Sequence, residues 1–446
     1  MPYTEIGTTW YKLSLIVGHA RRDKSVRFTS LAHLLDEEFL RDCYSELNRN
    51  SAVGIDGISW QEYGRELEKN LSKLVTRLKR GAFKPKPARR VYIPKNDTET
   101  RPLGISALEN KIVERGIATI LEHIYEQDFH EFSYGFRPKR NAHQALKQVS
   151  DQITFQAVNH IVEADIKGFF DNVSHEQLMD FIQIRVKDRS LLTLIEKFLK
   201  AGYIDDGMLI QTDKGTPQGS ILSPILANIY LHCVLDEWFE TMVKPNVKGH
   251  CELVRYADDF ICLVQYEHEA KRIEIGLRNR FNKFGLELHP GKSRNISFGR
   301  FEKENSRRQK RKANTFDFLG LTHYCDVSRK GYFKVGRKTR CKKFAASCRE
   351  MNSWLKAVRN LTKTKDWWTT LSVKLLGHYQ YYGVSENYRS IAKFYQHVLR
   401  MVHKWLNRRS QKRKMNWRKF QKYLTHYPLP KPKVVHNFYL SHDTMS

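Results

Sequence analysis

The chain of 446 residues lacks the features that mark membrane and secreted proteins. No uninterrupted apolar run approaches the length that spans a bilayer, and the N-terminal residues lack the basic and then apolar order of a signal peptide. The seven cysteines form no C-x-x-C pair and have no histidine at the spacing of a zinc site. We therefore expect no membrane partner, and we expect a reducing compartment in which the thiols are small buried side chains.

Acidic residues are scarce toward the C-terminus. The whole chain has 77 Lys and Arg against 48 Asp and Glu, a formal charge of +29, whereas residues 331–446 contain 26 Lys and Arg against four acidic residues. Charge this one-sided favours a polyanionic partner, and the aromatic residues interleaved with it can stack on bases. A solvated basic face is the alternative. With no membrane-spanning segment, nucleic acid is the favoured partner.

The stretch VRYADDFICLV, residues 254–264, places Asp258 and Asp259 between two short apolar runs. This pattern predicts a β-hairpin with both carboxylates at its turn. Aspartate is a common turn residue, so the pair by itself decides little. Adjacent carboxylates are also the oxygen ligands that Mg²⁺ prefers, which requires a third carboxylate from elsewhere in the chain.

The third carboxylate is expected at Asp165. The apolar run HIVEADI, residues 160–166, predicts a buried strand that ends near Asp165, and Ser174 with Gln177 predicts the start of the next helix. Three converging carboxylates are typical of two-metal phosphoryl transfer, in which one ion helps to activate a primer 3′-hydroxyl and the other supports the triphosphate. Such a cluster stays ionised only when cations neutralise it.

With these motifs the sequence resembles the group II intron-encoded reverse transcriptase and maturase family over nearly its whole length. Further blocks that carry the resemblance are NSAVGIDGIS at 50–59, RRVYIPKNDTETRPLGIS at 89–106, FSYGFRPKRNAHQAL at 132–146, GTPQGSILSPILANIYL at 215–231, GLELHPGKS at 285–293 and FDFLGLTH at 316–323.

The resemblance implies an α+β fold, a right-hand polymerase with fingers, a palm whose antiparallel sheet packs on helices, and a helical thumb or maturase domain. We expect a helical extension and the start of the fingers at 1–88, fingers and palm at 89–315, primer grip and thumb at 316–426, and a basic proline-containing tail at 427–446. The polar segment 302–314 is expected to be a loop or linker.

The resemblance assigns the metal site to Asp165, Ile166, Asp258 and Asp259, of which Asp259 binds less directly than the other two aspartates. Lys292 resembles the lysine proposed to protonate the departing pyrophosphate. A lysine beside a turn can equally well bind phosphate without transferring a proton.

The nucleotide site is expected to involve Lys95 and Arg101, which match the two cations that clamp an incoming triphosphate. Their alternative is a pair of solvated surface charges. Gln218 resembles the residue that touches the incoming nucleotide or its template partner, and Gly219 allows close backbone approach.

Choice of sugar is expected to depend on Phe170, five positions after Asp165, whose ring would collide with a ribose 2′-hydroxyl. A core role for Phe169 or Phe170 is the alternative. Arg137 and Arg140 are expected to hold the template backbone, unless they pair with nearby acids instead.

The implied reaction is addition of dNTPs to a DNA or RNA primer on an RNA template, with two Mg²⁺ ions for which Mn²⁺ could substitute. Binding of the group II intron RNA and of target DNA, with assistance to splicing and retrohoming in the bacterial cytoplasm, is implied for intron-encoded members. The sequence stops at Ser446 without a His-Asn-His nuclease, so second-strand cutting is not expected. Two alternatives stay open: a free-standing reverse transcriptase used in phage defence or another role, and a maturase that has lost polymerisation.

Overall fold

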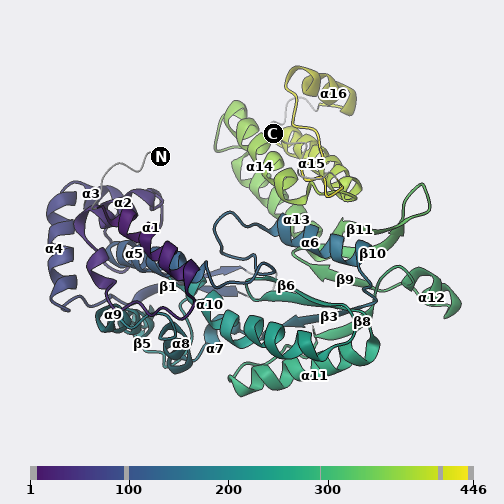
Figure 1. Ribbon diagram of the computed structural model, residues 1–446. Coiled ribbons are helices and arrows are strands. Elements are labelled where there is room, and N and C mark those ends of the chain that lie inside the picture. Colours follow the sequence, from purple (N-terminus) through teal and green to yellow (C-terminus); the bar gives the residue numbers. More distant parts are fainter. Residues whose placement is uncertain (1–7, 95–99, 292, 410–414, 440–446) are drawn as a thin grey trace.

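The structure is a computed structural model that describes residues 8–94, 100–291, 293–409 and 415–439 (Figure 1). Lys95 and Lys292 therefore lie outside the described residues. Within those ranges no helix combines the length and the apolar character needed to cross a membrane.

Helices dominate the N-terminal part and share one hydrophobic core with the helices behind the central sheet. Thr8, Asp36 and Ser59 each accept a hydrogen bond from the backbone N–H three residues further on, which starts three of the helices. The helix Leu108–Tyr125 lies in the middle of this core, with Ile112 and Ile117 fully buried. The elements are α1 (Thr9–Arg22), α2 (Glu37–Glu46), α3 (Trp60–Gly64), α4 (Leu67–Lys79) and α5 (Leu108–Tyr125).

A four-stranded sheet, ordered β2-β1-β4-β5, forms the fingers beside these helices. Its first two strands are antiparallel, with Val91 opposite Leu103, and the third joins in parallel, with Ala88 opposite Tyr203. Arg101 is exposed near the beginning of its strand. The strands are β1 (Ala88–Pro94), β2 (Thr100–Ile105), β4 (Tyr203–Asp205) and β5 (Met208–Ile210).

The palm is an antiparallel sheet in the order β6-β7-β3-β8. Apolar residues on both faces of its central strands are buried. Helices cover one face, and Figure 1 shows α11 lying under the sheet, whereas the other face packs against one helix and the C-terminal three-stranded sheet. The strands are β3 (His160–Asp165), β6 (Cys251–Tyr256), β7 (Asp259–Val264) and β8 (Arg294–Ser297), and the helices are α6 (Ala142–Phe155), α7 (Phe169–Asn172), α8 (His175–Ile182), α9 (Arg189–Leu199), α10 (Ser223–Leu231) and α11 (Glu267–Lys283).

The C-terminal part has a three-stranded sheet, ordered β11-β10-β9, followed by helices that stand above the palm in Figure 1. These thumb helices have a hydrophobic core of their own, which includes Leu371, Phe394 and Val398. The elements are β9 (Thr315–Phe318), β10 (Leu321–Val327), β11 (Phe333–Thr339), α13 (Cys341–Val358), α14 (Thr364–Tyr382), α15 (Tyr388–Asn407) and α16 (Trp417–His426). The α+β right-hand architecture expected from the sequence is confirmed.

The polar segment 302–314 differs from its expected loop, because it begins with the helix α12 (Glu302–Arg308). The carboxylate of Glu302 is buried and accepts two hydrogen bonds from Arg311, at 2.6 and 3.0 Å, and one from the backbone N–H of Asn314 at 2.8 Å. A single buried acid thus ties down a basic segment that looks fully solvated in the sequence.

Candidate functional site

The three aspartates lie together at one end of the palm sheet. Asp165 is the last residue of β3 and is paired with Asp259, the first residue of β7, in the antiparallel register. Asp258 occupies the turn between β6 and β7, directly before Asp259. The hairpin over 254–264 and the strand that ends at Asp165 are both confirmed. All three carboxylates are partly buried at this end of the sheet.

Burial and the charges of neighbouring carboxylates weaken the acidity of Asp258 and Asp259. Burial, together with the charge of Asp165, raises the pKa of Asp258, while Arg101 and Arg255 lower it. Burial and the charges of Asp258 and Asp165 raise the pKa of Asp259 to about 7. A group of repelling oxygen donors suits a hard divalent cation, because the cation removes the repulsion and takes oxygen ligands. The residues present therefore fit Mg²⁺.

The metal-free protein is expected to lose stability as the pH rises from about 4 to 7, the window set by the rise in the pKa of Asp259 from 3.8 to about 7. A carboxyl whose pKa is raised on folding binds its proton more tightly in the folded state than in the unfolded state. As the pH rises through the window, that proton is lost and its contribution to the stability of the folded state is lost with it. The melting temperature, measured at each pH with a chelator present, should therefore fall across this window. Asp259→Asn should remove much of that fall.

The exposed Asp180 provides the matched control for that experiment, because Asp180→Asn should leave the pH dependence of the melting temperature unchanged. Added Mg²⁺ should flatten the wild-type curve. If the Asp259→Asn and wild-type curves run parallel from pH 4 to 7, repulsion within the cluster does not limit stability.

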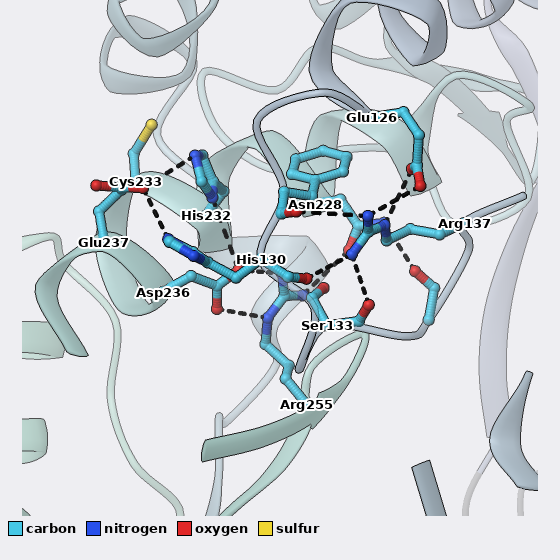
Figure 2. A network of polar contacts seen from close by, with 12 residues as sticks. Glu126, His130, Ser133, Arg137, Asn228, His232, Cys233, Asp236, Glu237 and Arg255 are labelled. Atoms are coloured by element: carbon cyan, nitrogen blue, oxygen red, sulfur yellow. Dashed lines mark hydrogen bonds and ion pairs between the residues drawn. The ribbon is translucent and has the colours of Figure 1, made fainter. Parts of the chain in front are cut away.

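Arg255 supports the aspartate turn from behind. Its guanidinium is fully buried and donates to Asp236 at 2.5 and 2.8 Å, to the side-chain oxygen of Asn228 at 3.1 Å and to the carbonyl oxygen of Ala257 at 3.1 Å. Figure 2 shows this network, which the sequence did not reveal beyond the presence of Arg255. Because loss of one partner would leave a buried charge unpaired, the network fixes the position of the turn.

The block FSYGF packs along the other side of the same strand. The N–H of Arg255 donates to the carbonyl of Phe132 at 2.9 Å, and the N–H of Tyr134 donates to the carbonyl of Arg255 at 2.9 Å. A Cβ on Gly135 would lie 2.2 Å from the nitrogen of Ala257. Glycine is therefore required where this segment touches the aspartate turn.

Asp259 contacts the hairpin of β9 and β10, the segment that the sequence predicts as a primer grip. The backbone N–H of Leu319, in the turn of that hairpin, donates to the carboxylate of Asp259. Tyr381 of α14 in turn donates to the carbonyl of Leu319 at 3.0 Å. This link joins the thumb to the aspartate cluster.

Ile166 is buried just beyond the end of β3. The backbone bonds on either side of it run from His289 N–H to Asp165 O, at 2.7 Å, and from Lys167 N–H to Glu287 O, at 2.8 Å. In an antiparallel bridge of this kind the polar groups of the enclosed residue point away from the partner strand. The carbonyl of Ile166 is therefore directed away from Leu288, to the side on which β7 lies.

A cavity of about 620 Å³ opens between the fingers sheet and the turn GTPQGS. Phe170, Gln218 and Pro102 line it, whereas the three aspartates lie outside its wall. Phe169 is buried in the core, so the structure separates the two phenylalanines as core and wall. Phe170 also packs against the main hydrophobic core from the cavity side, and its contact with a nucleotide stays a prediction.

Gln218 is fixed by close contact between its backbone and β2. Its carbonyl accepts a hydrogen bond of 2.6 Å from the N–H of Gly104. Gly219 has φ +106, and a Cβ there would lie 2.6 Å from the carbonyl oxygen of Gly104. The expected close backbone approach at Gly219 is confirmed.

Arg137 does not face a template. Its side chain is 2% exposed, makes two hydrogen bonds of 2.9 and 3.0 Å to Glu126, and donates to the carbonyls of His130 and Ser133. Arg140 pairs with Glu131 at 2.6 Å. The prediction that Arg137 holds the template is wrong, and the alternative of structural pairing holds.

Comparison with known proteins places this site in a family. Residues 93–323, just over half of the chain, match the reverse transcriptase (RNA-dependent DNA polymerase) family. The group II intron-encoded protein LtrA of Lactococcus lactis subsp. cremoris is 42% identical over 207 residues, which cover 46% of this chain and 34% of LtrA. This chain thus matches about a third of the length of LtrA.

Two further relatives extend the comparison. Protein YkfC of Escherichia coli strain K12 is 36% identical over 278 residues, covering 55% of this chain and 73% of YkfC. Nuclear intron maturase 1, mitochondrial, of Arabidopsis thaliana is 33% identical over 92 residues, covering 21% of this chain and 13% of the relative. The segment that matches the family contains all three clustered aspartates and the cavity wall at Phe170 and Gln218, so the chain belongs to the reverse transcriptase family of group II intron-encoded proteins.

Proposed function

We propose that the protein is an RNA-directed DNA polymerase that adds dNTPs to a DNA or RNA primer on an RNA template. The observation that carries this proposal is the cluster of Asp165, Asp258 and Asp259 at one end of the palm sheet, inside the reverse transcriptase segment. The fingers cavity lined by Phe170 and Gln218 adds a place for a nucleotide.

Asp165 and Asp258, with the carbonyl of Ile166, would hold two Mg²⁺ ions, and Mn²⁺ is expected to substitute for them. When bound, the ions would lower the pKa of the primer hydroxyl and stabilise charge on the triphosphate. The carboxylate of Asp259 would act mainly through Leu319, keeping the primer-grip hairpin against the cluster.

Arg101 is the described residue that would bind the triphosphate. It is exposed on β2 and close enough to Asp258 to lower the pKa of that carboxyl. A guanidinium in this position can bind phosphate oxygens and bring them toward the aspartates. Lys95 and Lys292 are proposed for the same phosphates, but both lie outside the described residues.

Primer extension tests the polymerase proposal. The purified chain is given a primed RNA template, Mg²⁺ and either dNTPs or NTPs. Extension with dNTPs, and much weaker extension with NTPs, is the expected result. No extension with either set, on several primed RNA templates and with Mn²⁺ as well as Mg²⁺, would overturn the proposal and favour a binding protein.

Phe170→Ala is expected to increase ribonucleotide incorporation relative to deoxynucleotide incorporation by about tenfold, the scale of a steric change in a binding pocket. Phe170 is on the cavity wall, and its removal would leave room for a 2′-hydroxyl. The ratio of kcat/KM for NTP and dNTP measures the effect.

Phe169→Ala is the matched control, because Phe169 is buried in the core and should lower the melting temperature without changing the sugar ratio. If the ratio changes in Phe169→Ala and stays constant in Phe170→Ala, the two roles are reversed.

Binding of the host group II intron RNA, with target DNA in retrohoming, is proposed as the second function. Helix α15 carries a basic stripe on the side away from its buried residues, at spacings of three or four positions. Its members are Arg389, Lys393, His397, Arg400 and Lys404. They line two cavities of about 310 and 410 Å³ on the thumb, which suits a polyanion that follows the helix.

A further inference from the structure

Two histidines and a glutamate gather behind the palm, on the far side of Arg255 from the aspartate turn. A nitrogen of His130, a nitrogen of His232 and a carboxylate oxygen of Glu237 all lie within 4.8 Å of one another. Glu237 Oε1 is 2.8 Å from His130 Nε2 and 3.5 Å from His232 Nε2. Figure 2 shows both rings turned toward this carboxylate.

A π-helical turn brings two of these residues to the same face. The segment His232–Asp236 after α10 is π-helical, and the N–H of Glu237 bonds to the carbonyl of His232. Residues five apart therefore stand one turn above each other, whereas in an α-helix they would point roughly 140° apart. Turns of this type are rare and occur frequently at functional sites.

The two rings are oriented before any ligand arrives. His232 packs edge-on against Phe129 and His130 stacks on Phe132, with ring centroids 5.5 and 5.1 Å apart. The other nitrogen of His232, Nδ1, is buried without a hydrogen bond and lies 3.9 Å from Asp236 Oδ2. A metal-binding imidazole usually donates its other N–H to a carboxylate, and Asp236, which already binds Arg255, lies just beyond hydrogen-bond distance for that role.

We propose that His130, His232 and Glu237 bind one transition-metal ion, with zinc as the favoured ion and water at the fourth position. Zinc bonds of about 2.0–2.1 Å place tetrahedral ligand atoms about 3.4 Å apart. The two distances from Glu237 Oε1, 2.8 and 3.5 Å, are both close to that spacing. Water can reach the fourth position because the Glu237 side chain is 46% exposed.

The donor set distinguishes this site from the aspartate cluster. Two imidazoles suit zinc rather than Mg²⁺, which prefers oxygen. Without metal, the same three side chains would form a hydrogen-bonded trio. Titration with zinc distinguishes the metal site from that trio.

The ion would join two segments that support the catalytic turn. His130 precedes the FSYGF block that pairs with Arg255, and His232 precedes Asp236, which binds the Arg255 guanidinium. Zinc is therefore assigned a structural role in holding these segments together, separate from the polymerase chemistry.

Zinc binding by the full-length chain tests the proposal. The protein is stripped with chelator, placed in excess Mg²⁺ so that the aspartates are occupied, and titrated with ZnCl₂. We expect one tightly held zinc per chain by mass spectrometry after gel filtration, two imidazole ligands by X-ray absorption at the zinc edge, and a higher melting temperature with zinc than without it.

His130→Gln and Glu237→Gln should each weaken zinc binding by about a hundredfold or more and abolish the zinc-dependent rise in melting temperature. His130→Gln keeps a hydrogen-bonding side chain opposite Glu237, so its fold without zinc should match the wild type. His19→Gln, on the exposed surface of α1, is the matched control and should behave as wild type. Equal zinc retention by all four proteins, or none by the wild type, would overturn the proposal.

Discussion

Asp258→Asn is expected to reduce dNTP incorporation on an RNA template by about a thousandfold or more, with RNA affinity nearly unchanged. A bound metal contributes several kcal/mol to stabilisation of the transition state, and each 1.36 kcal/mol corresponds to about tenfold in rate. The asparagine side chain keeps one oxygen but has no negative charge. The proposed metal site would then retain only the carboxylates of Asp165 and Asp259. Single-turnover primer extension measures the rate.

Affinity should survive in this variant because the basic surface of the thumb lies on other elements. Filter binding of the same primed template measures it. Asp180→Asn, an aspartate exposed on α8, is the control that should keep the wild-type rate. Asp258→Asn activity within a few-fold of wild type would remove Asp258 from the metal site.

Asp258→Asn should also leave the metal-free fold at least as stable as the wild type at neutral pH. The variant removes one of the charges that raise the pKa of Asp259. A loss of both activity and melting temperature would point to a misplaced turn rather than to a missing ligand. The two readouts together thus distinguish a functional loss from a structural one.

The cluster of three aspartates could be predicted from sequence because its pattern is local. A strand that ends in Asp165 and a hairpin with Asp258 at its turn are both visible in runs of about ten residues. The sequence also favoured Phe170 over Phe169 for the nucleotide side. The structure buries Phe169 and places Phe170 on the cavity wall, and the role of Phe170 toward a nucleotide stays a prediction.

Arg137 shows where local patterns fail. An arginine in the polar block GFRPKR looks exposed, but Phe136 has φ +57, which turns the chain. As a result Phe136 is 48% exposed while Arg137 points inward to Glu126. A left-handed backbone at a non-glycine residue leaves no reliable sign in the sequence.

The histidine and glutamate trio was hidden for a different reason. His232 and Glu237 are five residues apart, a spacing that neither α-helical nor strand periodicity places on one face. His130 comes from a segment about a hundred residues earlier, brought close by the pairing of FSYGF with β6. Metal-ligand motifs in sequence searches rely on short fixed spacings, so this cluster requires the fold.

Neutralising the basic stripe of α15 should weaken binding to RNA by about a hundredfold at physiological salt. Each phosphate contacted on a single strand contributes about −0.7 to the slope of log affinity against log salt, so four lost contacts make the slope shallower by about 2.8. The variant replaces four exposed side chains with glutamine, namely Arg389, Lys393, Arg400 and Lys404. Titrations at several salt concentrations give the slope.

The control neutralises four charges on α11, which lies under the palm sheet in Figure 1, away from the thumb. These residues are Lys271, Arg272, Arg278 and Lys283, all exposed. Loss of affinity through net charge alone would be equal in the two variants. If the RNA binds a defined surface on α15, the loss of affinity should be several times larger for the α15 variant. Salt screens the attraction between the RNA and charges that lie more than about a Debye length away from it.

Comparison of the cognate intron RNA with a scrambled RNA of the same length then separates the maturase from a free-standing polymerase. Recognition of folded RNA adds contacts that depend on shape as well as on charge, so the wild type should prefer the intron even at salt concentrations that suppress the electrostatic term. The α15 variant should lose splicing assistance more than primer extension on a simple template, because its aspartate cluster and Arg101 are unchanged. If wild type binds both RNAs equally at every salt concentration, the stripe serves only to hold the template, and a free-standing reverse transcriptase in phage defence or a similar role becomes the better interpretation.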